Sequence, residues 1–469
     1  MGDDNPLIRD SHPRVYILFS LSVFFLVAVA VSTIVFVNRQ NAEDRRVHAA
    51  IEKELSVIRA QGQPLTAEDL ARLHPDPPSD RDAAILLKPA LALLSIPKGT
   101  TNVPFFGETG LPNSVPFTPE VMVQIQNLLD TNQTTLDSIP WDRLERAWVG
   151  AGLAHGFTNL THTPGVTQLN KLLCLRALLR AEEHDPHGAM QSLLQALLST
   201  DTCRGGLTIH YFVRLSGEDR ACQTLERIVN RTQFADEDLA AVSKALTMTN
   251  MTGTKDMVIG ERCLNLFFED MLKSAAIERT AGVNSPFKRL SRMFQARLAY
   301  NDDSLLHYLD WNRQCLEALD LPLSNSVIVL RDIEKEAHPT PHFSIINVFR
   351  RDRVSISDMF LHGFPLTEQL LSEGTTVAKV RATITALAIE RWRLAHHGQL
   401  PASLTDLVPR YLPTAPIDPF NGQLLCYKKL TAGYVVYSVG PDFTDDGGTP
   451  QLPNSKEAAH YDVVFTVDK

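Results

Sequence analysis

The spacing of hydrophobic positions changes along the chain, and the first segment is apolar without a helical or strand period. Residues 15–38 carry no charged side chain. At about 1.5 Å per helical residue this run extends about 35 Å, enough to cross a hydrocarbon core of about 30 Å. Arg14 and Arg39 flank the run, which is too long for the apolar part of a cleaved signal peptide. We therefore expect an uncleaved transmembrane helix at 15–38, after a short tail at 1–14.

Beyond residue 38 the apolar positions recur every three or four residues, as in amphipathic helices. Residues 39–118 read as a helical and then proline-rich connecting region, in which Thr66 is placed to cap a helix with an acidic first turn. Residues 119–365 are expected to form a helical domain, with an irregular part at 320–365. The predicted fold class is therefore mainly α.

One helical hairpin is clear within this domain. Helical spacing at Leu169–Glu183 and at Ala189–Leu198 is interrupted by the turn His184–Gly188. Small alanines on both segments permit close packing, as in a tetratricopeptide hairpin. Because no second copy follows at a period of about 34 residues, a helical bundle or TPR-like region is favoured over a repeat array. We expect protein partners to bind to this helical domain.

At the C-terminal end the period changes from helical to alternating. A long helix is predicted at Val377–His397 and ends at Gly398. A short helix is predicted at Ser403–Val408, where Ser403 and Asp406 approximate a capping box. Three strands with turn residues between them are then predicted at Leu424–Lys428, Tyr434–Val439 and Asp462–Val467.

The order of these C-terminal motifs resembles the C-terminal half of the major pseudopilin of type II secretion. The likeness lies in GQLPASLTDLVPRYLPTAPIDPFNG at 398–422 and YSVGPD at 437–442. It is also similar to a module that uncharacterised single-anchor membrane proteins of planctomycete-like bacteria carry after a helical region. The resemblance implies a small α+β pseudopilin-like module with an antiparallel sheet at 366–469, and a calcium-holding loop.

The chain also departs from pseudopilins near its apolar run. The Gly-Phe cleavage motif and the glutamate that follows it in pseudopilins do not occur beside residues 15–38. More than 300 residues separate this run from the pseudopilin-like part, whereas a pseudopilin joins the two in one helix. We therefore expect the module to serve association or folding rather than assembly into a pilus.

Carry-over from the family places calcium in the acidic loop between the last two strands. Asp442, Asp445 and Asp446 lie there beside two glycines. Calcium takes roughly six to eight oxygen ligands, and glycine lets backbone carbonyls turn inward. Asp462 could approach from the start of the last strand. An ordinary acidic turn explains the same residues, and the spacing differs from that of an EF-hand.

Composition narrows the function classes only a little. The net charge of −9 argues against nucleic acid as a partner. The six cysteines are scattered without a CxxC pair, so zinc spacing is absent and buried thiols are expected. The sequence contains no HExxH, GxSxG or Walker motif.

These observations lead to two hypotheses about function. The leading one is a non-enzymatic membrane-anchored envelope protein, a scaffold or accessory component linked to secretion. The alternative is a membrane-tethered hydrolase with a site assembled from Glu261, His338 and Asp418. The resemblance implies a single-pass inner-membrane protein with a periplasmic bulk. The basic residues that follow 15–38 favour a cytoplasmic bulk instead, and the sequence leaves this conflict open.

Overall fold

The computed structural model describes residues 13–97, 100, 102–107, 115–150, 162–204, 206–246, 253–281, 302–337, 365–450 and 461–469. In these residues the chain is mainly helical, with a small three-stranded antiparallel sheet at the C-terminal end. The helices are α1 (Pro13–Ala60), α2 (Ala67–Leu73), α3 (Ala83–Leu91), α4 (Pro119–Thr131), α5 (Gln133–Asp137), α6 (Trp141–Leu144), α7 (Thr163–Glu182), α8 (Pro186–Asp201), α9 (Thr208–Arg231), α10 (Asp236–Leu246), α11 (Gly253–Ala281), α13 (Asp302–Leu319), α14 (Leu323–Ala337), α17 (Leu366–Ala395) and the 3₁₀ helix η3 (Leu404–Leu407). The strands are β1 (Cys426–Lys429), β2 (Tyr434–Ser438) and β3 (Val463–Val467).

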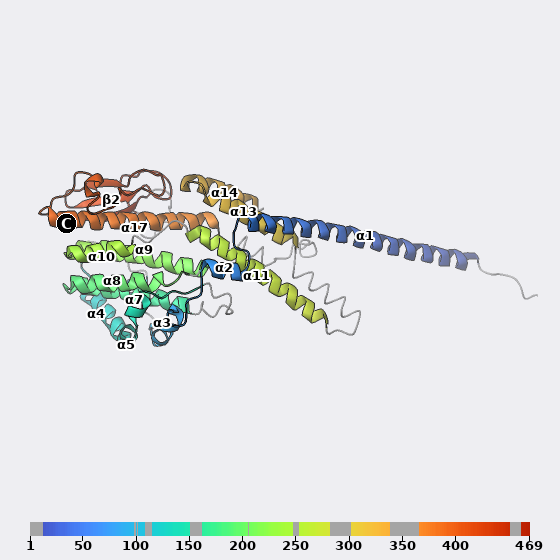
Figure 1. Cartoon of the computed structure of the whole chain (residues 1–469), viewed down its shortest axis with the longest axis horizontal. Coiled ribbons are helices and arrows are strands. Elements are labelled where there is room, and N and C mark those ends of the chain that lie inside the picture. Colours follow the sequence, from blue (N-terminus) through green and yellow to red (C-terminus); the bar gives the residue numbers. More distant parts are fainter. Residues whose placement is uncertain are drawn as a thin grey trace, which may run out of the picture.

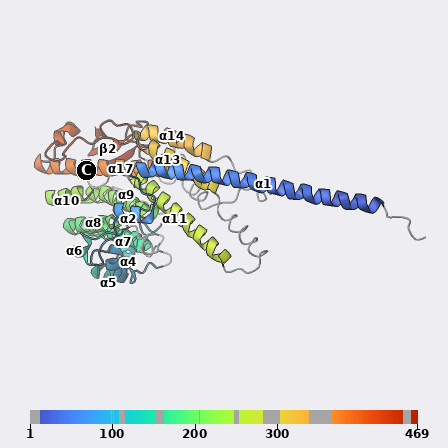
Figure 2. The same cartoon turned by 45° about the vertical axis from the view of Figure 1, so that its right-hand side comes forward.

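The helices of the body are stacked in layers that end at the sheet (Figure 1). The short helices α3, α4 and α5 lie at one side, followed by α7 with α8, then α9 with α10, then α17 and the sheet (Figures 1 and 2). The predicted hairpin is confirmed as α7 and α8, which pack along each other. Its turn is fixed by Asp185, whose side chain accepts a 2.9 Å hydrogen bond from the amide of Gly188 at the start of α8.

Helix α17 connects two hydrophobic cores. Its C-terminal half, including Val380 and Leu387, is buried in a core that also contains α7–α10 and Tyr434 of the sheet. Its N-terminal half, including Leu366 and Leu370, is buried in a second core built from α11, α13, α14 and the end of α1. The sheet packs directly on α17, so the C-terminal module is part of the helical body rather than an appendage.

The three predicted strands are confirmed, in the order β1-β2-β3 with antiparallel pairing. Helix α9 covers the outer edge of β3 with side-chain hydrogen bonds. Glu226 accepts from the amide of Thr466 at 2.9 Å, and the Asn230 side-chain amide donates to the Thr466 carbonyl at 2.8 Å. Asn230 also accepts from the amide of Asp468 at 2.7 Å. These bonds satisfy backbone groups that an edge strand would otherwise leave unpaired.

The N-terminal region differs from the prediction. The sequence predicts a transmembrane helix at 15–38 and a connecting region that starts at residue 39, whereas α1 is one continuous helix across that boundary. It extends away from the body, and its C-terminal part packs against α13 through the buried side chains of Ile51 and Ile58 (Figures 1 and 2). Among the residues that the structure describes, no helix has both the length and the apolar character that a membrane span requires. The predicted single-pass transmembrane helix is therefore not supported.

The region expected to be irregular at 320–365 also contains a helix. Leu323–Ala337 forms α14, and its Leu323, Val327 and Leu330 are buried in the second core. Their spacing of four and three residues is typical of a buried helix face. Pro322 directly precedes the helix, a position at which proline does not disrupt helical structure. The prediction gave too much weight to proline as a sign of irregular structure.

Candidate functional site

The acidic loop predicted to hold calcium is closed from the inside by Asp462. This side chain is 1% exposed and accepts hydrogen bonds from the amides of Asp446 (3.3 Å), Gly448 (2.6 Å) and Thr449 (3.2 Å). Burial raises the pKa of Asp462, while the three amide bonds act in the opposite direction. The carboxylate therefore holds the loop in shape by accepting backbone donors.

The other three predicted ligands do not converge with Asp462. Asp442 accepts from the amide of Thr444 at 3.0 Å, and Asp445 accepts from the amide of Gly447 at 2.9 Å. Both contacts are local turn bonds of the kind that aspartate commonly makes. The Oδ2 atom of Asp446 is buried and accepts no hydrogen bond from the described residues.

A calcium ion in this loop would need several oxygen ligands that converge on one point. Among the described residues, no three Asp, Glu, His or Cys side chains are arranged to hold a metal ion together. In addition, the ammonium of Lys428 donates to the carbonyl oxygen of Gly447 at 2.7 Å, so a cation already occupies one oxygen of the loop. The four carboxylates do not form a cage in this arrangement, and the calcium site remains a prediction.

Asp418, one of the residues of the hydrolase hypothesis, is buried at the end of β2. It is 1% exposed, and its Oδ1 accepts from the amide of Phe420 (2.9 Å) and the hydroxyl of Ser438 (2.8 Å). Its Oδ2 accepts from the amide of Val439 at 2.8 Å. The carboxylate thus ties the IDPFNG segment to the sheet, and both of its oxygens are engaged.

Glu261, the second residue of that hypothesis, caps a helix from outside. It lies on α11 and accepts from the amide of Thr208 at 3.3 Å and from the Thr208 hydroxyl, at the first residue of α9. Burial raises its pKa, while the bonds from Thr208 act in the opposite direction. Glu373 of α17 does the same for α11, where it accepts from the amides of Gly253 (3.0 Å) and Thr254 (2.9 Å). His338, the third residue, lies outside the described residues.

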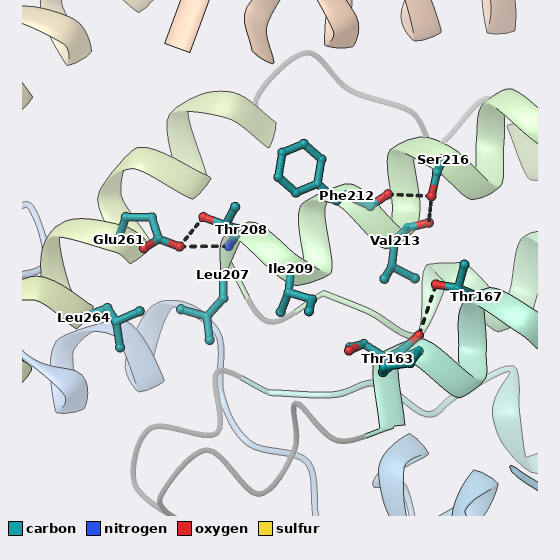
Figure 3. A pocket seen from close by; sticks show the side chains of 11 residues that line it. Thr163, Thr167, Leu207, Thr208, Ile209, Phe212, Val213, Ser216, Glu261 and Leu264 are labelled. Atoms are coloured by element: carbon teal, nitrogen blue, oxygen red, sulfur yellow. Dashed lines mark hydrogen bonds between the residues drawn. The ribbon is translucent and has the colours of Figure 1, made fainter. Parts of the chain in front are cut away.

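Glu261 also borders a cavity of about 510 Å³ beside the first turns of α9, which we call the α9 cavity (Figure 3). Figure 3 shows Glu261 and Leu264 on one side of it and Thr163 and Thr167 on the other. Most of its wall is apolar. Its lining residues are Thr163, Pro164, Thr167, Leu207, Thr208, Ile209, Phe212, Val213, Ser216, Glu261 and Leu264.

A second and larger cavity lies where the helical body meets the C-terminal module. This joint cleft measures about 920 Å³ and is bordered by α9, α14, α17 and the segments that flank the acidic loop. Charges of both signs line it, and Lys379 forms an ion pair with Asp219 inside it. Its lining residues are Phe212, Leu215, Ser216, Asp219, Gln223, Arg331, Glu368, Leu371, Ser372, Thr375, Thr376, Lys379, Pro441, Asp442, Phe443 and Tyr461.

Tyr461 is a residue of the joint cleft whose pKa is shifted by its surroundings. Burial raises the pKa of its phenol, the positive charge of Lys379 acts in the opposite direction, and the negative charges of Asp442 and Glu368 raise it further. The hydroxyl therefore stays protonated at neutral pH and remains a hydrogen-bond donor.

A group of buried histidines lies near the start of α9. His210 is 1% exposed, and the ring centroids of His162 and His210 are 6.4 Å apart. Burial, together with the nearby His162 and His74, lowers the pKa of His210 to about 3. His210 is therefore neutral in the folded protein at neutral pH.

Sequence reasoning assigned no role to Glu373, Asp219 or Lys379. Glu373 and Lys379 interrupt the apolar and small positions of a long helix, and that interruption was the available signal, whereas Asp219 lies in a charged run that gave none. The cysteines agree with the prediction: all six are free, and five of them are buried.

Comparison with protein-family models, with curated proteins and with solved structures found no match to this chain.

Proposed function

We propose that this protein is a non-enzymatic scaffold that binds a partner polypeptide in the joint cleft. The observation that carries the proposal is the lining of this cleft, where α9, α14, α17 and the segments around the acidic loop contribute to one surface. Three aromatic rings, Phe212, Phe443 and Tyr461, lie there with Arg331. Aromatic residues and arginine are enriched at the centres of protein interfaces.

The charges of the cleft support a peptide as the occupant. An extended peptide presents donors and acceptors along its backbone, and it needs partners of both kinds. Lys379, Arg331 and the Tyr461 hydroxyl supply donors, whereas Glu368 and Asp442 supply acceptors. Such a mixed wall suits a polypeptide better than an apolar ligand.

The hydrolase alternative has weaker support from the described residues. Asp418 accepts three hydrogen bonds, one from its own segment and two from the end of β2, and it is not among the residues that line either cavity. Glu261 lines the α9 cavity, but its contacts are those of a helix cap. A catalytic pair would need both carboxylates within reach of one substrate.

We also propose that the C-terminal module is pseudopilin-like and that the scaffold is an accessory component linked to secretion. The order of α17, η3 and the three antiparallel strands, with an acidic loop before the last strand, supports the first statement. Because α17 is buried in both cores, the module is suited to association within this protein rather than to a pilus. This supports an accessory role.

A photo-crosslinking amino acid at Ser372 tests the proposal in the cells that produce the protein. Ser372 is an exposed residue of the joint cleft. We expect one discrete adduct from this position and none from Gln191, an exposed residue on α8 that serves as the control. Arg331→Glu should weaken the adduct and Arg331→Lys should retain it. Adducts of equal pattern from both positions, or no adduct from Ser372, would refute the proposal.

A further inference from the structure

The α9 cavity has a chemical character that the scaffold function does not use. Among the described residues that line it, Glu261 is the one with an ionisable carboxyl group, and none of them is cationic. Leu207, Ile209 and Val213 contribute to an apolar wall beside it. A carboxyl group against such a wall favours a ligand with a cationic or donor-rich end and an apolar body.

Two further hydroxyl groups of the cavity lining donate their protons within their own helices. The hydroxyl of Thr167 donates to the carbonyl of Thr163 at 3.1 Å, and that of Ser216 donates to the carbonyl of Phe212 at 2.7 Å. Because these protons are engaged with backbone carbonyl groups (Figure 3), the two hydroxyls do not act as donors to a ligand. An anion would therefore find no donor in these two groups.

We propose that the α9 cavity binds a small organic ammonium ligand, a primary amine on an aliphatic or aromatic body, with the ammonium at Glu261. The cavity volume of about 510 Å³ lies in the usual range for small-molecule sites. The apolar body packs against Leu207, Ile209 and Phe212. This site is independent of the peptide proposed for the joint cleft.

The position of Glu261 makes the site more than an apolar gap. The Thr208 amide and hydroxyl both donate to the Oε1 atom of Glu261, so its carboxyl group is held in place at the cavity wall. Burial raises the pKa of this carboxyl group, and an ammonium beside it would compensate for the lost hydration of its charged form. A bound ammonium would therefore stabilise the charged form of the Glu261 carboxylate.

The test is calorimetric titration of the full chain with octylammonium, octanol and octanoate. These probes share one body and differ in the head group. We expect octylammonium to bind at least about tenfold more tightly than octanol, as a charge-assisted hydrogen bond requires, and octanoate to bind most weakly. Equal binding of octylammonium and octanol, or no binding of octylammonium, would overturn the proposal.

Three variants separate the carboxyl group from the fold. Glu261→Gln keeps an amide oxygen for the Thr208 cap but removes the charge, so octylammonium should weaken about tenfold while octanol stays unchanged. Glu237→Gln makes the same change at an exposed position of α10 and should alter neither. Ile209→Trp, at a residue that is 38% exposed, should fill the cavity and weaken both probes. Loss of octylammonium binding in Glu237→Gln would contradict the assignment.

Discussion

Replacement of Asp418 removes one acceptor that serves three buried donors. The amides of Phe420 and Val439 and the hydroxyl of Ser438 donate to its two oxygens at 2.8–2.9 Å. All four residues are at most 4% exposed, so water does not readily replace the lost acceptor. Substitution of Asp418 therefore tests whether this carboxylate stabilises the packing of its segment on the sheet.

The expected magnitude follows from the number of donors. A buried donor without an acceptor costs about 1–3 kcal/mol, and removal of a buried charge offsets part of the sum. We expect Asp418→Ala to lower the free energy of unfolding by about 3–5 kcal/mol. Asp418→Asn keeps Oδ1 for Phe420 and Ser438 but sets an amide donor against the N–H of Val439, and should cost about 1.5–3 kcal/mol.

Urea unfolding of the full chain, followed by circular dichroism and tryptophan fluorescence, measures these differences. Ser438→Ala is the control because it removes one neutral donor from the same acceptor; the Ser438 hydroxyl also accepts from the Gly440 amide at 3.2 Å, so the variant should cost about 1–2 kcal/mol. The order Asp418→Ala, Asp418→Asn, Ser438→Ala is the expected result. An Asp418→Asn variant within about 0.5 kcal/mol of the wild type, or a Ser438→Ala variant as unstable as Asp418→Ala, would refute the reasoning.

Three further predictions concern the turns, the buried histidine and the acidic loop. Gly433 and Gly398 share a φ of +83°, but a Cβ at Gly433 would lie 1.7 Å from the Val467 carbonyl oxygen, whereas nothing lies within 4 Å at Gly398. By urea unfolding, Gly398→Ala should cost about 1 kcal/mol and Gly433→Ala about 3 kcal/mol or more; equal costs would contradict this. The pKa of His210, about 3, lies below that of an unfolded histidine, about 6.5, so the unfolded state takes up the proton first as the pH falls. The stability that neutral His210 contributes is therefore present above pH 6.5 and is lost between pH 6.5 and 3. His210→Phe should reduce the slope of the free energy of unfolding against pH by up to about 1.4 kcal/mol per pH unit in this range. An unchanged slope would exclude His210 as the cause of the acid destabilisation. Millimolar calcium should raise the thermal unfolding temperature of the full chain, and Asp445→Ala with Asp446→Ala should abolish that rise, while no shift in the wild type would leave the loop an ordinary acidic turn.

Elements that depend on neighbouring residues could be predicted from the sequence. Thr66 caps α2 as expected and forms a capping box with Asp69, and the predicted capping box of Ser403 and Asp406 forms at η3. The strands follow from alternation and from the glycine turns, because both signals act within a few residues. The long C-terminal helix was predicted to begin at Val377 but begins at Leu366. The prediction missed the first turns because Gly374 and the two threonines before Val377 are weak helix formers.

Contacts between distant segments could not be predicted in this way. Glu261 and Thr208 are 53 residues apart, and Glu373 and Thr254 are 119 apart. A glutamate on a helix has the same sequence signature whether it faces water or caps another helix, and only the packing decides between them. The hydrolase hypothesis assigned chemistry to Glu261 for this reason. The apolar run at 15–38 was likewise read from its local composition alone, without knowledge of the single helix α1.

The side chains that α9 places along β3 determine how the sheet can grow. On that side Glu226 and Asn230 already bind the backbone groups of Thr466 and the amide of Asp468, so a segment from another molecule would have to displace them to extend the sheet. Strand addition without such displacement would have to use β1, at the opposite edge, where the exposed Lys428 and Lys429 place positive charge. Basic edge residues discourage pairing with identical copies and favour acidic strands. One edge of the sheet is thus covered by α9, and the other edge carries positive charge. Both features disfavour edge-to-edge aggregation.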